Sequence, residues 1–257
     1  RRRLRSGGAR RVTPAPLGWF GIFRLGLVQA ALGAVVVLTT ATLNRVMVVE
    51  LALAAAVPGT LVALHHAVQI LRPKFGHGSD VGGRRTPWIV GGMAVLAAGG
   101  LLAAVATAWT AEARLPGLAL AVVAFVMIGA GGAAAGTSLL ALTASRVALE
   151  RRPSAAAVVW LMMIAGFVVT AGVAGALLDP FSTTRLVMVA AGVAAGAFVL
   201  ATVAVWGLEG PRAVAAATTD APPPAFRAAM AQIWAEPEAR RFTLFVFVAM
   251  LAYSLQD

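Results

Sequence analysis

The 257-residue sequence contains no cysteine, and only 12% of its residues are charged. The missing cysteines exclude disulfide bonds and thiolate metal sites. Soluble domains carry about 25% charged residues, so this chain has too few to keep a fold of its size dissolved in water. Hydrophobic residues make up 60% of the sequence, which indicates a protein whose solvent is the lipid bilayer.

Acidic residues are especially scarce, because there are only ten against 21 lysines and arginines. Enzymes that transfer prenyl groups hold magnesium and diphosphate with clustered aspartates, and the sequence has no D-x-x-x-D or D-D-x-x-D cluster. We therefore expect neither an enzyme nor a metal site. The basic residues flank apolar runs, so the excess of positive charge indicates membrane topology rather than nucleic-acid binding.

Long apolar runs predict an all-α, polytopic membrane protein. A membrane-spanning helix needs about 20 mostly apolar residues, and six runs approach or exceed that length. The predicted spans are residues 25–43, 54–71, 88–108, 115–142, 155–178 and 186–207. A seventh run begins near Phe242 and reaches Asp257 before it could cross a bilayer. We therefore expect these residues to be part of a longer protein.

The spans divide the chain into four parts. Residues 1–24 form a basic N-terminus whose aromatic segment, 15–24, is expected at the membrane interface. Residues 25–207 form a six-helix transmembrane half, 208–241 a linker and 242–257 the start of helix seven. Apolar residues at helical spacing in the linker predict an amphipathic helix on the membrane or bundle: they are Phe226, Met230, Ile233 and Trp234. This layout is typical of a transporter with two six-helix halves, of which this is the N-terminal one.

The positions of the basic residues predict the orientation. Of the 21 lysines and arginines, all but Arg45, Arg114 and Arg185 fall on one side of the predicted bilayer. The positive-inside rule makes that side, and with it the N-terminus, cytoplasmic. The opposite side holds a turn predicted at residues 44–50.

The loop between the second and third predicted spans carries a motif. Its sequence, Gly76-His-Gly-Ser-Asp80-Val-Gly-Gly83-Arg84-Arg85, matches G-x-x-x-D-x-x-G-R-R, the signature loop of the major facilitator superfamily. The glycines permit a tight turn, and Asp80 can accept hydrogen bonds from helix amides or from an arginine. The resemblance implies a major-facilitator-type helical bundle in which this loop latches the two halves together on the cytoplasmic side. The alternative is a basic, glycine-rich turn without that role.

Several stretches also resemble a narrower group of proteins: residues 42–51, 58–59, 64–69, 72–88 and the last apolar run, 247–257. They are similar to the PucC family, also called LhaA or bacteriochlorophyll-delivery proteins. The resemblance implies an assembly factor for light-harvesting complexes in the bacterial inner, or intracytoplasmic, membrane. Its implied partners are antenna polypeptides and the reaction-centre complex, together with bacteriochlorophyll, which would be its cofactor.

The alternative function is a secondary transporter of a small hydrophobic molecule such as a tetrapyrrole. Such transport normally requires charged groups within the spans for coupling to protons or sodium. The six predicted spans contain no Asp, Glu, Lys or Arg, which favours the assembly factor.

Polar residues inside the predicted spans are the candidate binding residues, because they are costly in lipid. A neutral imidazole of His65 or His66 could ligate the magnesium of a bacteriochlorophyll, and Gln69 shares a helix face with His65. The structural alternative is a histidine that hydrogen-bonds a neighbouring helix. Gln29 in the first span could line a central cavity or join two helices.

Small residues predict where helices approach each other closely. G-x-x-x-G spacing occurs at Gly132 and Gly136 in the fourth predicted span and at Gly192 and Gly196 in the sixth. Such spacing lets two backbones meet. We interpret both pairs as packing sites within the bundle rather than as dimerisation motifs.

Overall fold

The computed structural model describes residues 15–210 and 225–254 of the chain. Within these ranges every regular element is helical, which confirms the predicted all-α class. The chain divides into two units, Arg1–Ala215 and Ala216–Asp257. Three of the predicted features fall on residues 1–14, 211–224 and 255–257 and lie outside the described residues: the N-terminal arginines, the proline-rich linker and the end of the seventh apolar run.

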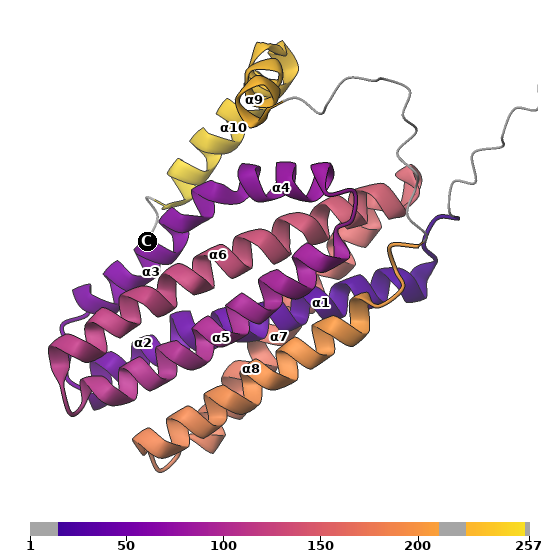
Figure 1. The fold of residues 1–257 in the computed structure, drawn as a ribbon. Coiled ribbons are helices and arrows are strands. Elements are labelled where there is room, and N and C mark those ends of the chain that lie inside the picture. The colour runs from indigo at the N-terminus through magenta and orange to yellow at the C-terminus, as the bar shows by residue number, and fades with distance from the viewer. Residues whose placement is uncertain (1–14, 211–224, 255–257) are drawn as a thin grey trace, which may run out of the picture. The chain divides into compact units, whose positions relative to one another are not determined.

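The first unit is a bundle of long helices (Figure 1). Its elements are α1 (Trp19–Val37), η1 (Leu38–Thr42), α2 (Leu43–Arg45), η2 (Val46–Glu50), α3 (Ala56–Val68), η3 (Gln69–Leu71), α4 (Arg72–Val81), α5 (Thr86–Thr110), α6 (Arg114–Arg146), η4 (Leu149–Arg151), α7 (Arg152–Leu177) and α8 (Thr183–Val205). The turns η1 and η2 are π-helical, whereas η3 and η4 are 3-10 turns.

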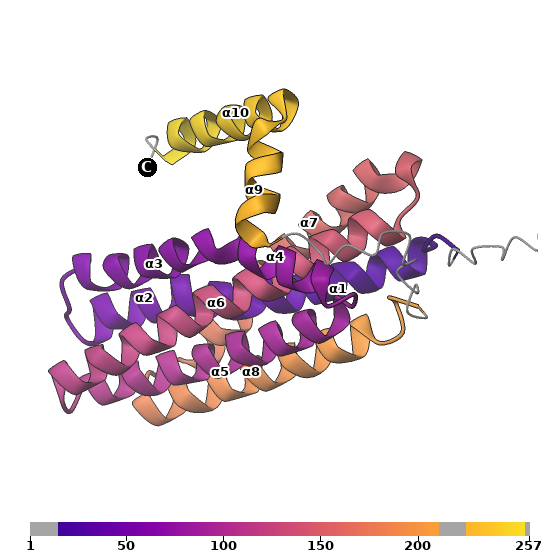
Figure 2. The same cartoon turned by 45° about the horizontal axis from the view of Figure 1, so that its top comes forward.

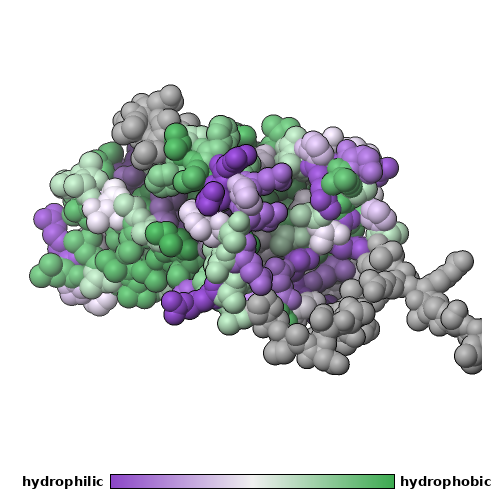
Figure 3. Space-filling model, turned by 90° about the horizontal axis from the view of Figure 1, so that it is seen from above, coloured by the Kyte–Doolittle hydropathy of each residue, from purple (hydrophilic) through white to green (hydrophobic). Residues whose placement is uncertain are grey.

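Five helical stretches of the described chain are long and apolar enough to cross a membrane. They are Trp19–Glu50, Thr86–Thr110, Arg114–Arg146, Leu149–Leu177 and Thr183–Val205. Five of the six predicted spans are thereby confirmed. The second, 54–71, is helical, but α3 has only 13 residues and continues through η3 into the polar α4. In the space-filling view, hydrophobic residues form a broad area on the left, and hydrophilic residues lie over the middle and the right and at the left edge (Figure 3).

The first helical stretch is longer than predicted at both ends. The predicted span 25–43 is part of a 32-residue stretch, Trp19–Glu50. The segment 15–24 is therefore not separate from the span, because its second half forms the first turns of α1. The turn predicted at 44–50 is wrong, since these residues continue the helix. No glycine or proline lies between residues 34 and 50 to interrupt it.

Helix α1 lies at the centre of the first unit (Figures 1 and 2). It packs against α7 and α8, and also contacts α6. Helices α5 and α6 form a closely packed hairpin, and α3 and α4 pack on α6. Apolar side chains such as Leu25, Leu38 and Phe125 are buried between these helices, so the core lies around α1, α5 and α6.

Two glycines allow the close contact between α5 and α6. A Cβ atom on Gly92 would lie 2.5 Å from the backbone nitrogen of Ala135. A Cβ atom on Gly131 would overlap the backbone nitrogen of Leu96. Only glycine lets the two backbones approach this far at these positions.

The G-x-x-x-G pairs do not mark close crossings of two backbones, so that part of the prediction is wrong. A Cβ atom on Gly132, Gly192 or Gly196 would meet nothing within 4 Å, and one on Gly136 would meet only Leu32, at 3.7 Å. Gly132 and Gly136 are nevertheless buried, and Gly192 and Gly196 line a pocket with residues of α1 and α7, so the four glycines lie inside the bundle or beside a gap without a close backbone contact.

The second unit contains α9 (Phe226–Ala235) and α10 (Pro237–Ser254), which contact each other. The helix predicted within the linker is confirmed as α9. The helix expected to start near residue 242 begins earlier, at Pro237. Proline is favoured in the first turn of a helix, where its missing N–H would have no partner.

Candidate functional site: a polar clamp at one end of the bundle

The signature segment joins α3 to α5, and much of it is helical rather than a turn. Gly76 and Asp80 lie within α4, which extends to Val81. Pro73 stands in the first turn of this helix, where its ring is compatible with helix initiation. The turn proper contains Gly83, whose φ of 66° is a left-handed conformation that favours glycine.

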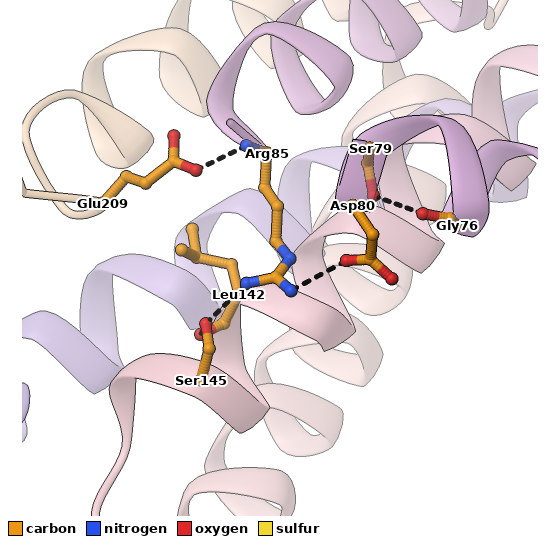
Figure 4. Close-up of polar contacts among 7 residues, drawn as sticks. All are labelled: Gly76, Ser79, Asp80, Arg85, Leu142, Ser145 and Glu209. Carbon is orange, nitrogen blue, oxygen red and sulfur yellow. Dashed lines mark hydrogen bonds and ion pairs between the residues drawn. The ribbon is translucent and has the colours of Figure 1, made fainter. Parts of the chain in front are cut away.

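Arg85 joins the signature segment to α6 (Figure 4). Its Nη2 donates to Oδ1 of Asp80 at 2.8 Å, and its Nη1 donates to the Ser145 hydroxyl at 2.9 Å. The Ser79 hydroxyl donates to the Gly76 carbonyl at 2.8 Å within α4. Within the described part of the chain, Asp80 therefore pairs with an arginine of its own segment.

Glu209, which follows α8, binds the N-terminus of α5. Its carboxylate accepts hydrogen bonds from the backbone N–H groups of Arg85 and Thr86, the latter at 2.9 Å. Such N–H groups lack partners within their helix and form its positive end. Burial raises the pKa of Glu209, but hydrogen bonds from Thr86 and Arg85 and the charge of Arg84, 3.9 Å away, outweigh burial and hold that pKa below its ordinary value.

Two further arginines hold the C-terminal end of α8. Arg24 in α1 donates through Nη2 to the carbonyls of Val203, at 3.3 Å, and Trp206. Arg146 in α6 donates through Nε to the Leu208 carbonyl at 3.1 Å. Cations are favoured there because the last carbonyls of a helix lack partners and form its negative end. We define the polar clamp as Arg24, Asp80, Arg84, Arg85, Ser145, Arg146 and Glu209.

The polar clamp is suited to fixing helix ends. The carboxylate of Asp80 accepts from Arg85, and that of Glu209 accepts from the N-terminus of α5. The arginines of the clamp donate to carboxylates, to a hydroxyl or to backbone carbonyls. Within residues 15–210 and 225–254, no group of three or more His, Asp or Glu side chains could hold a metal ion. The clamp thus connects α1, α4, α5, α6 and the end of α8.

The candidate pigment-binding residues have different environments. His65 is 2% exposed, and its Nε2 lies 2.8 Å from Nε2 of Gln69. Arg72 donates to Oε1 of Gln69, so the amide nitrogen faces the ring and His65 Nε2 accepts its hydrogen. His66 is exposed on α3, with its ring centroid 4.8 Å from that of His65. His66, rather than His65, presents its imidazole away from the bundle.

Gln29 lies between α1 and α7. Its Nε2 donates to Sδ of Met163 at 3.2 Å, whereas its buried Oε1 has no hydrogen-bond partner among the described residues. The contact with Met163 corresponds to the second of the two roles predicted for Gln29, that of joining helices.

Comparison with protein families matches residues 42–257 to the family described as "PUCC protein". This chain belongs to the PUCC protein family. It is 54% identical over 241 residues to the "Bacteriochlorophyll synthase 44.5 kDa chain" of Rhodobacter capsulatus, covering 94% of this chain and 56% of that protein. It is 30% identical over 256 residues to "Protein PucC" of Rhodovulum sulfidophilum, covering 92% of this chain and 55% of that protein.

The PUCC chain spans about half the length of the curated relatives it matches. A further relative, at 34% identity over 252 residues, is the "Uncharacterized protein in puhA-bchM intergenic region" of Rhodobacter capsulatus; it matches 92% of this chain and 52% of that protein. No solved structure shows significant similarity. The family is therefore established by sequence.

Sequence reasoning found the signature segment of this PUCC protein but missed the residues around it. Glu209, Arg24 and Arg146 were not recognised as site residues. The sequence could have indicated Glu209 as a site residue, because it is one of only ten acids and closely follows an apolar span. Its partner could not be identified from the sequence, because Thr86 is separated from it by four helices.

Proposed function

We propose that this protein is an assembly factor for bacterial light-harvesting and photosynthetic complexes, which binds antenna polypeptides and delivers or shields bacteriochlorophyll. Its membership of the PUCC family carries the proposal, since relatives are named PucC and bacteriochlorophyll synthase chain. Those names describe the relatives, and we extend the role that they suggest to this chain as a proposal. We further propose that this chain acts without catalysis, because the clamp's charged groups serve as caps and ion pairs for helix ends.

Helix α7 is the surface that we propose for antenna polypeptides. In the most apolar stretch of η4 and α7, 11% of the residues are buried inside the protein, compared with 56% in the corresponding stretches of α5 and α6. Val168, Val169 and Val173 are 66%, 63% and 51% exposed. In lipid, transmembrane helices associate mainly through side-chain packing, and α7 offers an uncharged face over several turns.

His66 is the residue that we propose for bacteriochlorophyll. A neutral imidazole can ligate the pigment's magnesium. His66 is exposed and fits this role, whereas Nε2 of His65 is already occupied by Gln69. Gln69 then positions His65, and Arg72 positions Gln69. The contact between His65 and Gln69 thus stabilises the part of α3 that carries His66.

We also propose a major-facilitator-type half whose clamp end is cytoplasmic in the bacterial inner membrane. The clamp joins the start of α1 to the ends of α6 and α8, and Leu17 N–H donates to the Arg146 carbonyl at 2.8 Å. In sequence, these ends and the turns next to them contain Arg24, Arg84, Arg85, Arg146, Arg151 and Arg152, which is the bias that the positive-inside rule expects of a cytoplasmic side. Asp80, at 60% exposure of its side chain, remains accessible for a second contact in the full-length protein.

Site-specific photo-crosslinking in the full-length protein tests the proposed surface. A photoreactive residue replaces Val168 on α7 or, as a control, Val123 on α6, which is also exposed, at 52%. We expect antenna-polypeptide adducts at Val168 and not at Val123. Adducts confined to the protein's own chain would overturn α7 as the surface. Tetrapyrrole uptake into proteoliposomes without any polypeptide adduct would favour the transporter instead.

A further inference from the structure

We propose that a groove between α4, α5 and α6 binds an anionic phospholipid, with an acyl chain in the groove and the phosphate at its basic mouth. The groove contains neither residues of α7 nor His66, so its test is independent of the test of the proposed function.

The groove has a volume of about 370 Å³ and an apolar lining. It exists because the residues along it are small: Gly91, Ala130 and Ala134 line it, and a Cβ atom on Gly91 would meet nothing within 4 Å. On α5 it runs from Pro87 to Val95, which is about 12 Å along the helix axis. A narrow apolar slot of this length suits a hydrocarbon chain.

Aromatic rings stand at one end of the groove. Phe75 from α4 and Trp88 from α5 pack edge to face, with centroids 6.3 Å apart, and both line the groove. Tryptophan is favoured at the level of lipid headgroups, where one end of the ring is wet. The mouth of the groove therefore lies where a headgroup would be.

The charge at the mouth favours an anionic headgroup. Residues 72–85 contain four basic residues, Arg72, Lys74, Arg84 and Arg85, which outnumber the two acids beside them, Asp80 and Glu209. Lys74 directly precedes the groove residue Phe75 and has no ion-pair partner among the described residues. A phosphate without a balancing choline would neutralise this excess, so the observations favour an anionic lipid over a zwitterionic one.

The experiment uses the full-length protein in vesicles that contain phosphatidylglycerol or phosphatidylcholine with the same photoreactive acyl chain. Cross-linked residues are mapped by mass spectrometry. We expect adducts at 87–95 and 130–134 with phosphatidylglycerol, and fewer with phosphatidylcholine. Lys74→Gln should reduce phosphatidylglycerol labelling about fivefold, the worth of one cation near an anionic lipid.

Gly91→Leu fills the groove and should reduce its labelling to background. Gly172→Leu on α7 is the matched control, because a Cβ atom there also meets nothing within 4 Å. Equal labelling by the two lipids would overturn the choice of an anionic headgroup. Labelling unaffected by Gly91→Leu, or an absence of lipid adducts because another helix covers the groove, would overturn the site itself.

Discussion

Glu209 accepts a hydrogen bond from the backbone N–H of Thr86 at 2.9 Å, so the residue after one helix caps the start of another. Arg85, the N-cap residue of α5, supplies no side-chain acceptor of its own. Caps are usually provided locally by Ser, Thr, Asp or Asn. Here the cap comes from the far end of α8, and it couples the position of α8 to that of α5.

Replacing Glu209 tests this cap. Glu209→Gln keeps the shape but removes the charge that faces the positive end of α5. We expect the free energy of unfolding in detergent to fall by about 0.5–2 kcal/mol. Glu150→Gln changes an exposed acid of η4 and should have little effect. Equal losses in the two variants would show that Glu209 has no special role.

The same contact predicts a pH dependence. The pKa of Glu209 is lower in the folded protein than its ordinary value, chiefly because hydrogen bonds from Thr86 and Arg85 outweigh the effect of burial. Its stabilisation is therefore complete above the unfolded pKa and is lost as pH falls through the folded pKa. The difference in melting temperature between wild type and Glu209→Gln should shrink on acidification. A difference that grows would contradict the assignment.

The sequence was informative about the spans because hydropathy alone defines them. It was less informative about their ends. Residues 44–50 contain Asn44, Arg45 and Glu50, which suggest a turn, but these polar residues are accommodated within the helical stretch, which ends only at Glu50. The opposite error occurred at Gly76, where the glycines suggested a turn and the chain forms α4.

The candidate site was predictable only in part, because its contacts are made through space. Arg85 and Asp80 belong to one motif and could be recognised together. Glu209 and Arg24 reach partners in other helices, and no spacing in the sequence encodes those contacts. Likewise, His65 is buried and His66 is exposed. The sequence does not distinguish these adjacent residues, because the difference arises from the packing of α3 on α6.

Adjacent glycines of α6 should respond differently to substitution. Gly131→Ala places a methyl group against the backbone of Leu96, so we expect a loss of about 1–3 kcal/mol in unfolding free energy. Gly132→Ala meets nothing within 4 Å and should be neutral or stabilising by about 0.5–1 kcal/mol. Thermal unfolding of the two variants in detergent measures the difference. Similar melting temperatures would contradict the proposed α5–α6 contact.

The two histidines should separate pigment binding from folding. His66→Ala should lower the bacteriochlorophyll content of the purified full-length protein without lowering its melting temperature. His65→Ala leaves the amide N–H of Gln69 without its acceptor, and we expect it to lower stability by about 1–3 kcal/mol. Absorption spectra and thermal unfolding report the two properties. Unchanged pigment content in His66→Ala would reject this ligand.

Binding of antenna polypeptides and bacteriochlorophyll, which we propose for this protein, is tested most directly in a photosynthetic host. The tagged full-length protein is purified under mild detergent, its absorption spectrum is recorded and its co-purifying subunits are identified. We expect near-stoichiometric light-harvesting polypeptides together with bacteriochlorophyll absorption. Preparations that contain neither, from a host that is actively assembling its antenna, would contradict this proposal.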